Sequence, residues 1–276
     1  MDQERKIVIL GRYGMLGNYL YNYLRIKNDN VIGLSRKDFD AEKLSSSEIE
    51  CILFKCGNNL TIINAIGYIK PSKVSDVSYI KINSIFPHIL ETICLNNGWK
   101  LIHISTDCVF KFKGNYTEID DYDADDIYGK SKAAGELHHS TTIRTSIIGE
   151  EQFHKYSLIE WIKSNRGKTV NGFDNHIWNG MTCLQLSKII YSIIDNNLYW
   201  EGIRNIFSPN SITKYDLILV VNEVYNLDLT INKISTSESC NKTLSSIYES
   251  ESDIFSKIPE IKDQIQEMRY YSDWFD

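Results

Sequence analysis

The sequence predicts an α/β fold in which a doubly wound parallel sheet is followed by a smaller C-terminal lobe. Short runs rich in β-branched residues alternate with helical patterns over roughly the first half of the chain, and this alternation is typical of parallel sheets. After about Gly149 the alternation loosens into helical patterns joined by polar segments. We therefore expect one unit at residues 1–149 and a second one mainly in residues 150–276, with some segments of the second returning to the first.

Local patterns place the individual elements. Aliphatic and β-branched runs predict strands at residues 6–10, 30–36, 61–65, 101–105 and 142–144. Apolar residues at helical spacing predict helices around residues 16–24, 83–96, 133–138, 158–162, 184–194 and 215–225. Ligands of open parallel sheets bind at the carboxyl ends of the strands, so we expect the C-terminal lobe to close over that edge and bind substrate.

Composition excludes several classes of protein. With 276 residues and 42% hydrophobic side chains, the chain is too apolar to be disordered throughout. The net charge of -6 and the lack of a basic run argue against a nucleic-acid partner. Apolar stretches are too short for a membrane span, and the N-terminal residues lack a secretory pattern. The six cysteines show neither zinc nor disulfide spacing, so we expect no metal site and a cytoplasmic location.

A glycine-rich segment joins the first predicted strand to the first predicted helix. Gly11, Gly14 and Gly17 form a GxxGxxG pattern, which suits a tight turn, backbone approach to a pyrophosphate, and close packing of helix on strand. Phosphates would lie on the helix N-terminus, as in Rossmann-type dinucleotide-binding sheets. The alternative is an ordinary turn. We expect cofactor contacts from Gly11, Arg12, Gly14, Met15, Leu16 and Gly17.

The end of the second strand indicates which nicotinamide cofactor binds. An acidic residue there binds the ribose of NAD, whereas arginine accommodates the 2′-phosphate of NADP. Ser35 and Arg36 stand at this position, with Lys37 next and Arg12 in the glycine segment as a second cation. These residues favour NADP(H), unless Arg36 and Lys37 are merely solvated surface cations.

A YxxxK pattern supplies the candidate chemistry. Tyr128 and Lys132 stand one turn apart on a predicted helix, where a nearby ammonium is expected to lower the pKa of the phenol. Thr106 follows the strand at 101–105 and brings a hydroxyl to the same edge of the sheet. This combination is suited to proton transfer at a carbonyl or alcohol.

Six segments make the sequence recognisable: GRYGMLG (11–17), NAIGYIKPSKV (64–74), INSIFP (82–87), residues 103–136, IRTSIIG (143–149) and WNGMTCLQLSKII (178–190). The chain resembles the extended short-chain dehydrogenase/reductases, and among them the dTDP-4-dehydrorhamnose reductase family. The resemblance implies hydride transfer to the 4-keto carbon of a nucleotide-linked 6-deoxyhexose. It also implies that Tyr128 is the proton donor, that Lys132 tunes it and binds ribose, and that Thr106 hydrogen-bonds the keto oxygen.

The same resemblance assigns further residues and an assembly. It implies cofactor contacts along residues 64–68, with Asn64, Ala65 and Ile66 foremost. Residues implied near the substrate are Tyr68, Lys70, Asn83, Arg144 and Trp178. It also implies a homodimer.

Cys108 departs from the tyrosine that many reductases of the family carry at this position. A cysteine there is similar to GDP-fucose synthases and to plant bifunctional nucleotide-rhamnose synthases, which epimerise C3 and C5 before reducing C4. This similarity predicts 3,5-epimerisation as well, with a UDP-linked sugar favoured over a dTDP-linked one, and His176 or Lys70 as the second acid or base. The alternatives are a 4-reductase alone, with Cys108 only packing, and a non-catalytic cofactor-binding regulatory subunit.

Overall fold

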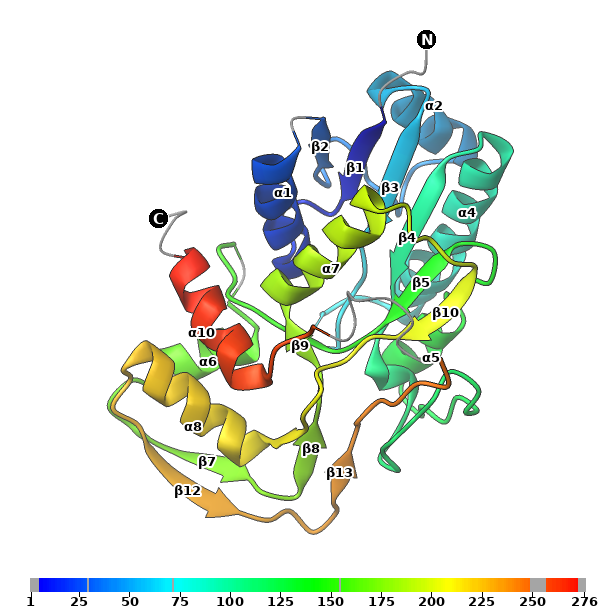
Figure 1. The fold of residues 1–276 in the computed structure, drawn as a ribbon. Coiled ribbons are helices and arrows are strands. Elements are labelled where there is room, and N and C mark those ends of the chain that lie inside the picture. Colours follow the sequence, from blue (N-terminus) through cyan, green and yellow to red (C-terminus); the bar gives the residue numbers. More distant parts are fainter. Residues whose placement is uncertain (1–4, 29, 71, 154, 249–256, 273–276) are drawn as a thin grey trace.

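A six-stranded parallel sheet forms the centre of the computed structural model, which describes residues 5–28, 30–70, 72–153, 155–248 and 257–272 (Figure 1). The strand order is β10-β5-β4-β3-β1-β2, and each neighbouring pair is parallel. The strands are β1 (Lys6–Leu10), β2 (Val31–Leu34), β3 (Leu60–Asn64), β4 (Lys100–Ile104), β5 (Thr141–Arg144) and β10 (Gly202–Asn205). The doubly wound sheet predicted from the sequence is confirmed.

Helices cover both faces of this sheet. Figure 1 shows α1 (Met15–Lys27) and α7 (Cys183–Asp195) in front of it, and α2 (Ser46–Cys56) and α4 (Phe86–Asn96) behind it. The alternation of β1 fits this arrangement, because Ile7 and Ile9 pack in one core with α1 and α7, whereas Val8 and Leu10 pack in the other with α2 and α4. Shorter helical segments in this half are α3 (Asp76–Tyr79), η1 (Ile80–Ile85), η2 (Asp107–Val109) and α5 (Ile127–Ala133).

The second half of the chain forms a lobe below the carboxyl edge of the sheet (Figure 1). Its helices are α6 (Leu158–Ser164), α8 (Lys214–Tyr225) and α10 (Ile261–Ser272). Its strands are β6 (Ile147–Ile148), β7 (Thr169–Phe173), β8 (His176–Trp178), β9 (Met181–Thr182), β11 (Ile212–Thr213), β12 (Thr230–Ile234) and β13 (Cys240–Asn241). Strand β10 and helix α7 of this half lie with the central sheet; the boundary at residues 149/150 stays a prediction.

One predicted helix is misplaced. The sequence pattern predicts a helix over 133–138, but α5 ends at Ala133 and turns follow. Close packing explains the change, since a Cβ added at Gly135 would lie 1.8 Å from the Asn83 carbonyl oxygen. The chain leaves the helix here and directs Glu136 into the core.

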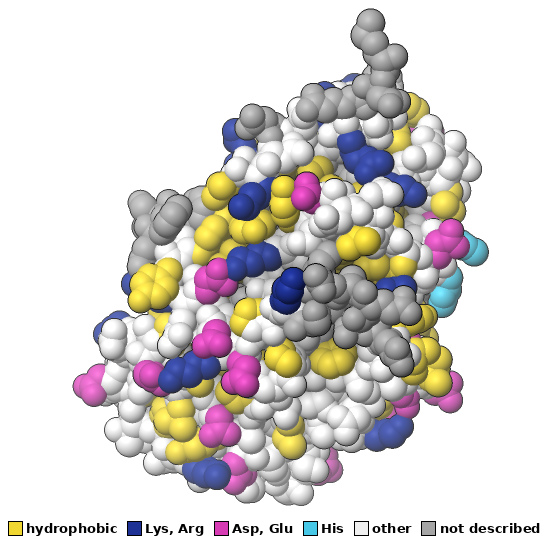
Figure 2. All heavy atoms as spheres, viewed as in Figure 1, with side chains coloured by type: hydrophobic (Ala, Val, Ile, Leu, Met, Phe, Trp, Pro, Cys, Tyr) yellow, Lys and Arg dark blue, Asp and Glu magenta, His cyan; other side chains and the backbone are white. Residues whose placement is uncertain are grey.

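On the face shown in Figure 2, acidic and basic side chains are interspersed over α8 and α10 and are not gathered into a patch of one charge. Within the described ranges, no helix is both long and apolar enough to cross a bilayer.

Candidate active site

The glycine segment between β1 and α1 fits a dinucleotide phosphate. Gly11 has a φ of +89° and a Cβ there would lie 3.1 Å from the Ala65 carbonyl oxygen, while a Cβ at Gly17 would lie 2.0 Å from the Gly11 carbonyl oxygen. Gly14 is the N-cap of α1 and brings no capping side chain. The first-turn N–H groups and the helix dipole are therefore available to an anion.

The side chains between these glycines have different surroundings. The guanidinium of Arg12 stacks on Tyr21, 3.8 Å from the ring centroid. Leu16 is buried in the core, so its side chain does not reach a cofactor as the sequence reading suggested; only its backbone can. Met15 is half-buried and lies against Gly149, where β6 has just ended.

Carboxylates that follow β2 make contacts that the sequence analysis did not predict. Asp38 folds back on Ser35 and accepts both its hydroxyl at 2.6 Å and its N–H at 3.0 Å. These hydrogen bonds lower the pKa of Asp38. Arg36 is also paired, through Nη2 with Glu42 at 3.1 Å and through Nε with Asp40 at 3.6 Å. The signal was present in the sequence as three acids within seven residues of Ser35.

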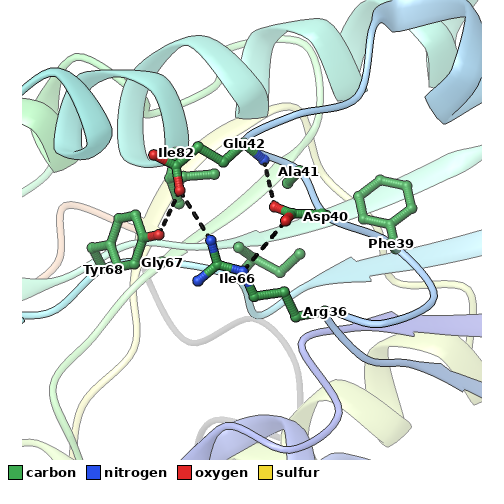
Figure 3. A pocket seen from close by; sticks show the side chains of 9 residues that line it. All are labelled: Arg36, Phe39, Asp40, Ala41, Glu42, Ile66, Gly67, Tyr68 and Ile82. Atoms are coloured by element: carbon green, nitrogen blue, oxygen red, sulfur yellow. Dashed lines mark hydrogen bonds and ion pairs between the residues drawn. The ribbon is translucent and has the colours of Figure 1, made fainter. Parts of the chain in front are cut away.

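A cavity of about 100 Å³ opens between the carboxyl ends of β2 and β3 (Figure 3). Arg36 and Glu42 form one wall and Ile66 and Tyr68 another, and Tyr68 donates its hydroxyl to Glu42 at 2.7 Å. The cavity adjoins the glycine segment through Ala65 and Ile66. It therefore lies where the adenosine end of a dinucleotide binds in such sheets. Tyr68, assigned to the substrate from the sequence, lies on this cofactor side instead.

Asn64 shapes the loop after β3 and does not face a ligand. Its amide is buried and bonds the His103 Nδ1 at 3.1 Å, while its Oδ1 accepts the Ile66 N–H at 3.1 Å. Burial holds the pKa of His103 well below its usual value, so this imidazole stays neutral. Asn64 thus holds the backbone of Ile66, a residue that lines the cavity.

Thr106 and Tyr128 meet at the carboxyl end of β4. Thr106 caps η2 by accepting the Cys108 N–H at 3.2 Å, and its hydroxyl lowers the pKa of the nearby Tyr128 phenol against the larger effect of burial. Tyr128 comes from the first turn of α5, which Asp126 caps by accepting the Gly129 N–H at 2.7 Å. The structure brings these two predicted hydroxyl groups together.

The electrostatics of Tyr128 differ from the sequence-based expectation. Burial, followed by the nearby Cys108 and Asp107, raises the pKa of its phenol. The groups that shift this pKa most do not include Lys132, whose Nζ donates to the Ile104 carbonyl oxygen at 2.7 Å. Burial in turn lowers the pKa of Lys132 to about 8, against the opposing effect of Glu136. The phenol is therefore held protonated by its own surroundings.

Cys108 lies beside Tyr128, but its thiol is not a ready base. Burial and the neighbouring Asp107 raise the pKa of Cys108 to about 12. It also interacts electrostatically with the ammonium of Lys242, which reaches it from the C-terminal lobe. No motif in the sequence marks Lys242.

The two residues proposed to act opposite Cys108 have different outcomes. His176 lies on β8 with its Nε2 2.8 Å from the Thr236 hydroxyl, and its ring packs on Phe173. These contacts do not join His176 to Cys108. Lys70 interacts electrostatically with Cys108, but its Nζ forms an ion pair with Asp126 at 2.8 Å.

Arg144 was assigned to the substrate pocket, and the structure corrects this. Its side chain is fully buried and makes a bidentate pair with Glu136, at 2.9 Å from Nε and 2.6 Å from Nη2. A further bond of 3.2 Å runs to the Asn205 side chain on β10. A guanidinium paired in this way supports the fold, because breaking a buried pair leaves an uncompensated charge.

Asn83 and Trp178 also have structural surroundings in place of the predicted substrate contacts. The Asn83 amide accepts the Tyr68 N–H at 2.9 Å and donates to the Tyr68 carbonyl at 3.0 Å, so it clamps the loop after β3. Trp178 is 4% exposed, and the ammonium of Lys214 lies 5.0 Å from its ring centroid. Neither side chain is free to bind a sugar.

Comparison with known proteins adds a family to this geometry. Residues 5–156 match the family described as RmlD substrate binding domain. The spore coat polysaccharide biosynthesis protein SpsK of Bacillus subtilis (strain 168) is 25% identical over 254 residues, which cover 86% of each chain. A dTDP-4-dehydrorhamnose reductase of Mycolicibacterium smegmatis is 30% identical over 140 residues, covering 48% of this chain and 40% of that protein.

Solved structures share the fold along the whole chain. A dTDP-4-dehydrorhamnose reductase from Bacillus anthracis str. Ames, solved in complex with NADP, superposes with a TM-score of 0.82 at 20% identity. The match covers 98% of this chain and 99% of that one. The lobe after residue 156, where sequence similarity is weaker, therefore has the same architecture.

Proposed function

The chain belongs to the family of the RmlD substrate binding domain, and we propose that it reduces the C4 keto group of a nucleotide-linked 4-keto-6-deoxyhexose with NADPH. It is a nucleotide-sugar keto reductase whose cofactor is NADP(H), as in the Bacillus anthracis reductase complex. The observation that supports the proposal is the placement of Thr106, at the end of β4, next to Tyr128 of α5 in a chain that matches this family.

The chain's own residues account for the proton. Thr106 and Tyr128 present two hydroxyl groups to one point at the carboxyl end of β4, where they can hydrogen-bond a keto oxygen. The reduced cofactor, when bound, supplies hydride to the carbonyl carbon. Tyr128 then gives its proton to the oxygen, which has gained the negative charge. Burial suits this role, because a phenol whose pKa is raised remains protonated until an alkoxide forms.

The cofactor would be held by the glycine segment and by the cavity beyond it. The N-terminal N–H groups of α1 would bind the pyrophosphate. Arg36 would bind the 2′-phosphate after exchanging its carboxylate partners for it. Lys132, at the Ile104 carbonyl, would bind the nicotinamide ribose.

For the nucleotide we place dTDP first, because the Mycolicibacterium relative is a dTDP-sugar reductase. The UDP sugar that Cys108 suggested from the sequence stands second. The homodimer and the cytoplasmic location implied earlier stay predictions, and light scattering over a range of protein concentrations tests the dimer.

The direct test measures NADPH consumption with dTDP-, UDP- and GDP-linked 4-keto-6-deoxyglucose. We expect turnover with at least one of these, and Tyr128→Phe should slow it by about 10²–10⁴, the usual contribution of a positioned acid. Tyr191→Phe, which removes an exposed hydroxyl bonded to Asp195, is the matched control. Cofactor binding without turnover on any of the three sugars would instead support the regulatory-subunit alternative.

Epimerisation at C3 and C5 is a second candidate activity, and it rests on the position of Cys108 beside Tyr128. The raised pKa keeps the thiol protonated at neutral pH, so in this candidate activity it would donate a proton and would not act as the base. In deuterated water, an epimerase would place deuterium at C3 or C5 of the product, and Cys108→Ser should suppress that exchange while reduction of an already epimerised sugar continues. A product free of deuterium at both carbons removes this candidate and leaves the reductase unaffected.

A further inference from the structure

Strand β13 links the C-terminal lobe to the reaction site. The backbone N–H of Lys242, just after β13, donates to Ile177 of β8 at 3.1 Å, and the N–H of Asn241 donates to Phe112 at 3.3 Å. The segment is thus held between the lobe and the loop that follows η2. These two backbone hydrogen bonds fix the position of the Lys242 backbone, from which its side chain extends.

That side chain ends at the loop carrying Cys108. Its Nζ donates to the Phe110 carbonyl at 3.0 Å and lies close enough to the Cys108 thiol to interact with it electrostatically. It also interacts electrostatically with Asp107, which is 3% exposed and accepts the Thr106 hydroxyl at 3.2 Å. Lys242 therefore contacts the loop on both sides of the thiol.

Several other charged or titratable groups face Cys108. Asp107 precedes it, Tyr128 approaches from α5, and Lys70 approaches from the loop after β3 with its partner Asp126. Lys214, at the start of α8, interacts with Asp107, Cys108 and Cys240. A buried carboxylate such as Asp107 is costly unless cations balance it, and Lys214 and Lys242 are cations from the other lobe.

We propose that Lys242 is a positioning residue of the reaction site, which holds the Cys108 loop beside Tyr128 and balances the Asp107 carboxylate next to the proton donor. The reaction site is then shared between the two halves of the chain. The part concerning Tyr128 rests on the proposed reductase function; the part concerning Cys108 does not. Burial opposes the ammonium of Lys242, but Cys108 and Asp107 raise its pKa overall, so it stays charged.

The test that needs no substrate is alkylation of Cys108 by iodoacetamide, followed across pH by peptide mass spectrometry on the full chain. Lys242→Met should slow it at least about tenfold, because an adjacent opposite charge shifts a pKa by about 1–3 units. Lys242→Arg, which keeps the charge, should react within about twofold of the unmodified protein by the same argument. Lys233→Met, on an exposed lysine over the Tyr215 ring, is the control.

Exposed Cys51 serves as an internal reference whose alkylation rate should be equal in all variants. The proposal is overturned if Cys108 in Lys242→Met is alkylated as fast as in the unmodified protein, or faster. It is also overturned if Cys108 in Lys242→Arg reacts as slowly as in Lys242→Met. Where turnover is found, oxidation of the product alcohol gives a second measurement, because Tyr128 must lose its proton in that direction. Its pH midpoint should move upward in Lys242→Met, whereas a purely structural loss would lower the rate equally at every pH. Absence of turnover would remove the reductase function and leave the alkylation result to decide.

Discussion

The ion pairs of Arg36 determine how strongly this chain should select NADPH over NADH. The Arg36 side chain is 63% exposed and lies between Asp40 and Glu42. Glu42 is itself fixed, because it accepts hydroxyl protons from Tyr68 and Ser78, each at 2.7 Å. A 2′-phosphate must therefore draw Arg36 away from two carboxylates that stay in place.

The expected preference follows from these competing contacts. One charge-assisted hydrogen bond contributes about 1.5–3 kcal/mol, and each exposed ion pair given up costs about 0.2–1 kcal/mol. Giving up both pairs leaves a difference of about −0.5 to 2.6 kcal/mol, with a midpoint near 1 kcal/mol, so we expect roughly sixfold and at most about eightyfold tighter binding of NADPH. Arg36→Ala should reduce this ratio to near one. Glu42→Gln removes one competing charge and should raise the ratio.

Calorimetric dissociation constants for NADPH and NADH measure this ratio in each variant. Lys37→Ala is the matched control, because it removes the neighbouring exposed cation and should leave the ratio unchanged. The reasoning is refuted if Arg36→Ala keeps the full NADPH preference, or if Glu42→Gln lowers it.

Three further predictions concern stability. Saturating NADPH, at about one hundred times its dissociation constant, should raise the free energy of unfolding by about 2.7 kcal/mol in thermal melts. Arg144→Met should cost about 3–5 kcal/mol in urea melts, because Glu136 is left buried without its partner, whereas Arg144→Met with Glu136→Gln should recover part of that loss. The pKa of Lys132 falls from 10.5 to about 8 on folding, so the unfolded chain binds the extra proton between these values and the folded state gains stability as pH rises through that window. Urea melts of Lys132→Met should lack that rise.

Much of the fold was predictable because its signals are local. The glycine segment, the continuous aliphatic run of β1 and the apolar spacing of α7 each depend on residues close in sequence. The helix expected at 133–138 failed for a non-local reason, since Gly135 packs against the backbone at Asn83, about fifty residues earlier.

The same distinction separates the site residues. The positions of Thr106 and Tyr128 could be predicted from motifs, because each stands where a strand ends or a helix starts; their catalytic roles stay a proposal. Arg144 was assigned wrongly because its partner, Glu136, reaches it only after the chain leaves α5. Lys242 was missed for a similar reason, since the residues it contacts are more than one hundred and thirty positions away.

The electrostatics of the site indicate which direction of the proposed reaction it favours. Oxidation of an alcohol needs Tyr128 as a phenolate, whereas reduction of a ketone needs it as a phenol. Burial, Cys108 and Asp107 all disfavour the phenolate, and the Lys132 ammonium that could stabilise it is bonded to Ile104 instead. The phenol thus keeps its proton at neutral pH and releases it only to a stronger base, such as the alkoxide left by hydride transfer. These neighbours therefore suit the proposed reduction, in which Tyr128 has to donate a proton.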